Sequence, residues 1–292
     1  MRCLILICLS FLLLGFAGCG PGSSDQEKKA GQAEARYLTI KGSDTMVHLI
    51  SAWAEEFMKM HPQVELSVTG GGSGTGIAGL INGTTEICAS SRMINTKEKE
   101  LADARHFNPQ EFKVALDGIA VIVHPDNKVG ALSLAQLQDI FTGKTMNWQK
   151  VGGADQSILV FSRESSSGTY VFFQEHVMNR QDYTPRARLL PGTSALVQAV
   201  SSDKGAIGYV GLGYVREAAE KVKAIKIKSP QSAEAIAPSE QSVIDGSYPI
   251  ARPLFLYTNG EPQGTAKDFI DFALSAPGQK IVSEAGYVSM KR

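Results

Sequence analysis

Residues 37–81 read YLTIKGSDTMVHLISAWAEEFMKMHPQVELSVTGGGSGTGIAGLI, and one short pattern occurs twice in this stretch. A strand-like run, first at 37–41 and then at 64–69, leads into a turn rich in glycine, serine and threonine. A helical run follows each turn, at 46–60 with the apolar spacing of an amphipathic helix and at 77–81 in a shorter form. Strands that alternate with helices predict an α/β fold with largely parallel sheets.

The alternation continues toward the C-terminus. Ser133 stands at the N-cap position before a helical run. Further strands are expected at 86–89, 114–124, 158–162, 206–210 and 253–257, and further helices at 97–104, 134–141, 170–178 and 266–275. The α/β pattern therefore covers the whole chain after residue 36.

The composition excludes several classes of protein. The 292 residues include 29 Lys and Arg against 29 Asp and Glu, so the formal net charge is zero. A neutral chain is not expected to bind nucleic acid, because such proteins are normally basic, and it is not an acidic disordered chain. A hydrophobic fraction of 43% and this length fit a soluble protein with two domains or one large one.

The N-terminus has the pattern of an export signal. One arginine, Arg2, precedes an apolar run at 4–16, which is shorter than the roughly 20 residues that a spanning helix needs. We therefore expect residues 1–18 to be a signal peptide. The run ends in FAGC at 16–19, and this ending is typical of bacterial lipoprotein signals, which predicts lipidation of Cys19. A plain signal peptide that is cut near Ala17 remains the alternative.

After Cys19 the chain is rich in glycine, serine and charged residues up to residue 36, which predicts a flexible tether over 19–36. Cys88 is then the single cysteine of the exported body, so no disulfide within that body is expected. Cys88 lies in a strand-like run and is expected to be buried. The five histidines are scattered, and no His or Cys cluster has metal-ligand spacing, so neither a metal nor a cofactor is predicted.

Three turns join a strand to a helix and are rich in hydroxyl groups. They lie at 42–45, 70–76 and 165–169, and Arg163 precedes the third. Each turn places free backbone N–H groups and hydroxyl donors at the positive end of a helix dipole. This chemistry suits an anion.

Three other motif interpretations fit less well. The glycines at 74, 76 and 79 match a dinucleotide fingerprint, but no acidic residue follows about 20 positions later at the end of a strand, and an exported protein would not meet NAD. The P-loop pattern fails because no Gly-Lys-Ser or Gly-Lys-Thr follows. Ser73 and Ser167 lack the Gly-x-Ser-x-Gly elbow of many serine hydrolases.

Together these segments resemble the phosphate-binding lipoproteins of bacterial ABC phosphate importers, which belong to the periplasmic-binding-protein superfamily. The resemblance covers residues 37–290. The matching segments are GSDTM at 42–46, GSGTG at 72–76, CASSR at 88–92, LDGIAVIV at 116–123, FTGK at 141–144 with Trp148, SRESSSGT at 162–169 and GAIGY at 205–209.

The resemblance implies a site for inorganic phosphate. By position, the family's ligand contacts fall on Thr45, Met46 (through its backbone N–H), Ser73, Ser91, Arg163, Ser167, Gly168 and Thr169. Many members carry, after Ala-Ser, an aspartate that accepts the proton of bound phosphate, and this chain has Ser91 there. Asp117, which interrupts an apolar run, is the preferred substitute. Asp44 is the alternative, and Glu164 is expected to orient Arg163.

The resemblance also implies a fold and a place in the cell. The fold is a two-lobed α/β periplasmic-binding-protein fold of type II, with two crossover hinge strands and the ligand in the cleft between the lobes. The crossover strands are expected at 114–124 and within 248–257, lobe 1 at 37–119 plus 250–292, and lobe 2 at 120–249. The protein is expected to be no enzyme, to be exported and held at the cell envelope by its lipid, and to deliver phosphate to the transmembrane subunits of an ABC permease.

Three alternatives remain open from the sequence. The protein could bind another tetrahedral oxyanion, such as sulfate or molybdate. It could be an exported phosphohydrolase or phosphoryl-transfer enzyme, although the sequence shows neither metal ligands nor a nucleophile–base pair. It could also be an adhesion or matrix protein that uses the same fold.

Overall fold

The computed structural model describes residues 36–230 and 234–290. The expected signal peptide, Cys19 and all but the last residue of the expected tether lie outside these residues, so these expectations stay predictions. In the described part, no helix is long and apolar enough to cross a membrane.

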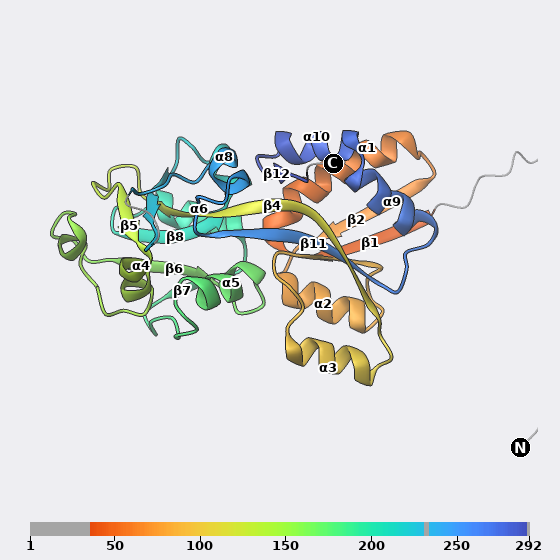
Figure 1. The fold of residues 1–292 in the computed structure, drawn as a ribbon, viewed down its shortest axis with the longest axis horizontal. Coiled ribbons are helices and arrows are strands. Elements are labelled where there is room, and N and C mark those ends of the chain that lie inside the picture. Colours follow the sequence, from red (N-terminus) through yellow and green to blue (C-terminus); the bar gives the residue numbers. More distant parts are fainter. Residues whose placement is uncertain (1–35, 231–233, 291–292) are drawn as a thin grey trace, which may run out of the picture. The chain divides into compact units, whose positions relative to one another are not determined.

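Strands and helices alternate along the chain, as the sequence predicts (Figure 1). The strands are β1 (Arg36–Gly42), β2 (Val64–Thr69), β3 (Ile87–Ser90), β4 (Pro109–Val123), β5 (Ala131–Ser133), β6 (Leu159–Arg163), β7 (Arg188–Leu190), β8 (Ala206–Gly211), β9 (Lys223–Ala224), β10 (Lys226–Lys228), β11 (Ala251–Asn259) and β12 (Val288–Ser289). The α-helices are α1 (Val47–Met60), α2 (Ser73–Ile81), α3 (Thr96–Ala104), α4 (Leu134–Phe141), α5 (Gly168–His176), α6 (Thr193–Ser201), α7 (Leu212–Glu217), α8 (Glu240–Ile244), α9 (Gly264–Leu274) and α10 (Ala276–Glu284). Short 3-10 helices lie at Asp44–Met46 and Trp148–Val151.

Ten of these strands form one sheet of mixed direction, with the main order β2-β1-β3-β11-β4-β8-β6-β7 and with β9 and β12 also paired to β4. The pairs at its two ends are parallel: β1 with β2 and β3, and β6 with β7 and β8. The pairs in the middle are antiparallel: β11 with β3 and β4, and β4 with β8. The expectation of largely parallel sheets is therefore wrong for the centre, because β4 and β11 carry the chain in opposite directions through it.

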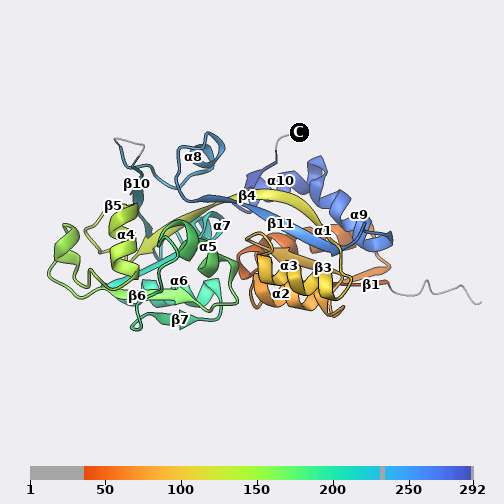
Figure 2. The same cartoon turned by 60° about the horizontal axis from the view of Figure 1, so that its bottom comes forward.

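The two crossover strands lie side by side in both views (Figures 1 and 2). β4 begins at Pro109, five residues before the expected start of its strand, and it pairs with β11 from Pro109 to Gly118. From Ile119 onward β4 pairs instead with β8. The two strands thus connect the two ends of the sheet.

The buried apolar side chains form two large cores. The first core contains Leu38, Trp53, Phe57, Val114, Ala115, Leu254, Leu256 and Phe269, among others. The second core contains Ile119, Val121, Phe141, Trp148, Phe173, Tyr209, Tyr248 and Ile250, among others. β4 therefore leaves the first core and enters the second between residues 115 and 119.

Some elements differ from the sequence-based expectation. α2 begins at Ser73, four residues early, because Gly72 adopts a positive φ of 98° that starts the helix directly after the glycine turn. α6, α7, α8 and α10 are not among the helices that the sequence predicts. α10 begins with Ala-Pro-Gly, which suggests a loop, but proline is tolerated in the first turn of a helix, and the Ser275 side chain accepts a hydrogen bond from Gly278 N–H.

Candidate functional site

The three hydroxyl-rich turns follow β1, β2 and β6. β1 leads through Ser43 into the 3-10 helix Asp44–Met46, β2 leads into α2 at Ser73, and β6 leads into α5 at Gly168. β3 ends at Ser90 and delivers Ser91. Because β1, β2 and β3 are parallel neighbours, their carboxyl ends lie at one edge of the sheet, where ligands bind in open α/β sheets.

Five buried hydroxyl groups meet at this edge, and we call them the hydroxyl cluster. They belong to Ser43, Thr45, Ser73, Ser91 and Thr169, each at most 2% exposed. Ser43 Oγ donates to Ser91 Oγ at 2.9 Å, Ser73 Oγ lies 3.3 Å from Ser91 Oγ, and Thr45 Oγ1 shares a hydrogen bond of 2.9 Å with Thr169 Oγ1. Four of the five, Thr45, Ser73, Ser91 and Thr169, are predicted site residues, and Thr169 belongs to α5.

The N-terminus of α5 packs tightly against this cluster. A Cβ atom on Gly168 would lie 2.3 Å from Ser73 Oγ and 2.6 Å from Ser91 Oγ, so the position requires glycine. Ser167 Oγ caps α5 by accepting hydrogen bonds from the backbone N–H groups of Thr169 and Tyr170. Its hydroxyl proton is then free to point toward a ligand.

Met46 contributes little beyond its backbone. Its side chain is fully buried in the first core, and its N–H donates to Ser43 O at 3.0 Å. An anion that accepts from the Met46 N–H, as predicted, would share this donor with the Ser43 carbonyl oxygen, whose hydrogen bond closes the 3-10 turn.

Arg163 is buried and fully oriented. Its Nη2 donates to Asp44 Oδ2 at 2.7 Å and to Pro191 O at 2.7 Å, and its Nη1 donates to Thr193 Oγ1 at 2.9 Å. Glu164 is exposed and is not among these partners. The expectation that Glu164 orients Arg163 is therefore wrong, because Asp44 and the loop between β7 and α6 hold the guanidinium group.

Asp44 connects the three turns. Its Oδ2 accepts from Arg163, its Oδ1 accepts from Gly71 N–H at 3.2 Å, and its backbone carbonyl accepts from the Tyr214 hydroxyl at 2.9 Å. Its side chain is 18% exposed, so it lies at the edge of the site rather than behind it.

Asp117 lies behind the hydroxyl cluster, fully buried on β4. Its Oδ1 accepts from Leu212 N–H at 2.9 Å, and its Oδ2 accepts from Arg252 Nη2 at 3.0 Å and Nε at 3.3 Å. Burial raises the pKa of the Asp117 carboxyl, and the Arg252 guanidinium and the Leu212 N–H oppose this rise. Both carboxylate oxygens of Asp117 therefore already accept hydrogen bonds from the protein.

Two buried arginines were missed by sequence reasoning. Arg252 lies on β11, directly opposite Asp117 in the strand register. Arg92 forms a two-bond ion pair with Glu98, of 2.6 and 2.7 Å, and Glu98 also closes the capping box of α3 with Asn95. For Arg252 the available signal was a single charged residue in the strand 251–259, but pairing it with Asp117 requires the register of β11 against β4.

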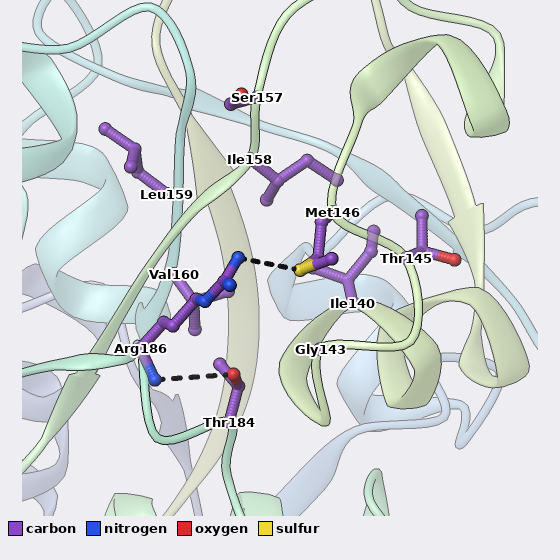
Figure 3. A pocket seen from close by; sticks show the side chains of 10 residues that line it. All are labelled: Ile140, Gly143, Thr145, Met146, Ser157, Ile158, Leu159, Val160, Thr184 and Arg186. Carbon is purple, nitrogen blue, oxygen red and sulfur yellow. Dashed lines mark hydrogen bonds between the residues drawn. The ribbon is translucent and has the colours of Figure 1, made fainter.

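Among residues 36–230 and 234–290, no group of three or more His, Cys, Asp or Glu side chains could hold a metal ion. Cys88 is fully buried in β3 and free, as expected. A cavity of about 310 Å³ lies elsewhere, between α4 and β6. Figure 3 shows its lining side chains, with Arg186 pointing toward Met146, and none of the predicted phosphate ligands lines it.

The chain matches a model of the PBP superfamily domain over residues 27–277. It is 35% identical to the phosphate-binding protein PstS of Staphylococcus haemolyticus, over 95% of this chain and 88% of that protein. It is 29% identical to PstS of Pseudomonas aeruginosa, over 94% of this chain and 88% of that protein. These relatives are named as binding proteins, in agreement with the prediction that the chain is not an enzyme.

Solved structures agree with these matches. A phosphate ABC transporter substrate-binding protein from Clostridium perfringens, with bound phosphate, superposes with a TM-score of 0.79 at 32% identity and covers 88% of this chain and 100% of that one. An ABC-type phosphate transport receptor from Vibrio cholerae superposes with a TM-score of 0.69 at 29% identity and covers 87% of this chain and 100% of that one. The two-lobed binding-protein fold is therefore confirmed, and the chain belongs to the PstS family of phosphate-binding proteins within the PBP superfamily.

Proposed function

We propose that this protein captures inorganic phosphate outside the cytoplasm and delivers it to the transmembrane subunits of an ABC importer. The observation that carries the proposal is the meeting of the hydroxyl cluster and the N-terminus of α5 at one edge of the sheet, where Asp44 of the first turn also pairs with Arg163. A tetrahedral oxyanion needs many hydrogen-bond donors at short distance, and hydroxyl groups, turn N–H groups and a guanidinium group supply them. The membership in the PstS family supports phosphate as that anion.

The proposed phosphate ligands are those that the sequence predicts: Thr45, Met46, Ser73, Ser91, Arg163, Ser167, Gly168 and Thr169. The anion lies between two lobes, residues 37–119 plus 250–292 and residues 120–249. The two cores support this division, because β4 changes core between residues 115 and 119. Donors from both lobes make closure depend on the ligand, and the closed form is what a permease can recognise.

A carboxylate is the part of the site that would tell phosphate from sulfate. Near neutral pH phosphate keeps a proton and sulfate does not, so a buried acceptor favours phosphate. Ser91 can both accept and donate, and it discriminates poorly alone. The contacts favour Asp44 over Asp117, because the Asp44 side chain is 18% exposed and pairs with the proposed ligand Arg163, whereas the Asp117 side chain is fully buried and is held by Arg252 and Leu212 N–H.

Calorimetric titration with phosphate, arsenate, sulfate and molybdate tests the function. We expect phosphate and arsenate to bind and sulfate and molybdate to bind much more weakly. Asp44→Asn should narrow the phosphate-to-sulfate ratio, and Asp117→Asn serves as the comparison. Tighter binding of sulfate or molybdate than of phosphate would replace the proposed ligand, and release of phosphate from a chromogenic ester would revive the enzyme hypothesis.

The proposed location is the bacterial cell envelope, in the periplasm or at the outer face of the membrane, with Cys19 carrying the lipid. Cys19→Ser should give a soluble or unprocessed protein, because the acyl chains have no attachment point. Mass spectrometry of the mature N-terminus checks this expectation, and an unmodified N-terminus at another residue would contradict it.

A further inference from the structure

Arg252 connects the hydroxyl cluster to the ion pair behind it. It is 3% exposed on β11, and its Nη2 lies 3.0 Å from Thr169 Oγ1 and 3.4 Å from Thr45 Oγ1. Thr45 follows β1, whereas Thr169 belongs to α5. One guanidinium group therefore contacts a hydroxyl from each side of the proposed phosphate site.

The N–H protons of Arg252 and the hydroxyl protons of Thr45 and Thr169 determine which of the two threonine hydroxyls can donate to a ligand. A guanidinium group only donates, so both threonine oxygens accept from Arg252. The two hydroxyls also share one hydrogen bond of 2.9 Å, which uses one of their two protons. The second proton needs an acceptor, and a phosphate oxygen between the two sides of the site is an acceptor of the right kind.

The remaining nitrogen of Arg252 points to the same ligand. Within the described residues, Nη1 is buried and has no hydrogen-bond partner. Nε and Nη2 bond Asp117, and Nη2 also reaches the threonines. Because the guanidinium group is a planar fork, one N–H of Nη1 lies along the edge that faces the threonines. Buried N–H groups are normally paired, so a ligand oxygen is expected there.

We propose that Arg252 is a second arginine of the anion site. It offers Nη1 to a phosphate oxygen, and through Nη2 it holds the Thr45 and Thr169 hydroxyls as donors toward the same anion. Asp117 balances its charge and fixes its orientation. This role rests on the proposed function of the protein, and it assigns Asp117 to positioning Arg252 rather than to accepting the phosphate proton.

The test removes the ion pair as a unit, because Arg252→Gln alone would leave Asp117 charged and buried. The variant Asp117→Asn with Arg252→Gln is made in the full-length chain, purified in mild detergent, and its dissociation constant for inorganic phosphate is measured by calorimetry together with its melting temperature. We expect a cooperative melt and a rise in the dissociation constant of about tenfold or more. The control, Asp271→Asn with Lys267→Gln, removes one carboxylate and one cation from an exposed ion pair on α9, outside the proposed site, and should stay within about twofold of the wild type.

If Arg252 had only a structural role, its loss would not change the effect of a Thr169 substitution on phosphate binding. Thr169→Val is therefore added to the wild type and to the double variant. If Arg252 acts through this hydroxyl, Thr169→Val weakens binding less in the double variant than in the wild type. Arg252→Lys keeps the positive charge and loses the planar guanidinium group, and its affinity for phosphate should fall as well. If the double variant does not fold, Thr169→Val is combined with Arg252→Lys instead, and the same comparison of dissociation constants is made.

Two results would overturn the inference while leaving the proposed function intact. One is a double variant, or Arg252→Lys, that binds phosphate as the wild type does. The other is a loss that adds fully to that of Thr169→Val. By contrast, a wild-type chain that does not bind phosphate would overturn the proposed function itself, so the two failures are distinguishable.

Discussion

In residues 36–230 and 234–290, three arginines are buried, and each is paired with a carboxylate. Arg92 pairs with Glu98, Arg163 with Asp44 and Arg252 with Asp117. The charges of the protein therefore balance locally, and the affinity for an anion depends on how the donors are oriented. Removal of one member of a pair leaves the other buried and unpaired, which is costly.

Arg163→Ala should abolish most phosphate binding. A buried dianion that loses its charged partner is destabilised by about 3–5 kcal/mol, whereas micromolar binding is worth only about 8 kcal/mol. We therefore expect the dissociation constant to rise by roughly a hundredfold or more. Titration calorimetry measures it, with Arg186→Ala as the control because Arg186 is an exposed arginine outside the proposed site. A dissociation constant of Arg163→Ala within about twofold of the wild-type value would show that Arg163 is not a phosphate ligand.

The Cys88 thiol should be unreactive in the folded protein. It is fully buried, and burial raises the pKa of this thiol, so the reactive thiolate is scarce. A form of the chain that begins after Cys19 contains no other cysteine. We expect no reaction with Ellman's reagent at mildly alkaline pH in the native state and one thiol per chain in guanidinium chloride. Fast labelling of the native protein would show that β3 opens readily.

At the scale of elements, helix N-termini from two parts of the sheet meet at the site. The turn between β2 and α2 contacts the turn before α5, since Gly74 N–H donates to Ser166 O at 2.9 Å. Their glycines permit this approach, because a Cβ on Gly72 would lie 2.5 Å from the same carbonyl oxygen. Small residues in these turns therefore determine how closely α2 and α5 can come together.

Gly168→Ala should weaken phosphate binding by about tenfold or more. The added Cβ would lie 2.3 Å from Ser73 Oγ, so α5 or α2 must shift, and overpacking of this kind typically costs about 1–3 kcal/mol. Gly130→Ala is the matched control, because Gly130 precedes β5, outside the proposed site, and a Cβ there meets nothing within 4 Å. Calorimetry and thermal melting check both variants. Equal affinity in the two variants would mean that the contact between α5 and α2 is not needed for binding.

At the scale of the whole described fold, two cores share one pair of crossover strands. The ion pair of Asp117 and Arg252 lies on these strands, and Asp117 also holds the start of α7 through Leu212 N–H. Hydrogen bonds of Thr45 with Thr169 and of Asp44 with Arg163 link the two parts of the sheet. A ligand bound among these groups would contact both cores at once and should stabilise both.

Phosphate should therefore raise the melting temperature of the entire fold in a single transition. At a hundred times the dissociation constant, a ligand that binds only the native state contributes about 2.7 kcal/mol, which corresponds to a shift of about 5–10 °C. Differential scanning calorimetry measures the shift, with chloride at equal ionic strength as the control. A shift confined to one of two separate transitions would mean that phosphate binds to one core only.

Local pattern in the sequence predicts a large part of this fold. Apolar alternation predicts β2 at its observed bounds, because a strand with one buried face repeats its apolar residues at the period of its own backbone. The N-cap residue Ser133 predicts where α4 begins. The three turns and the resemblance that they carry also point to Thr45, Ser73, Ser91 and Thr169, four of the five members of the hydroxyl cluster.

Tertiary structure alone decides the direction of the central strands and the partners of the buried charges. Arg252 and Asp117 are 135 residues apart in sequence, and Arg163 and Asp44 are 119 apart. No local pattern relates residues at such distances. The register of β4 against β11 pairs Asp117 with Arg252. The end of β6 meets the turn after β1, and this pairs Arg163 with Asp44 rather than with its neighbour Glu164. Hydrophobic periodicity identifies which face of an element is buried, but a buried charge takes its partner from whichever distant element packs against that face.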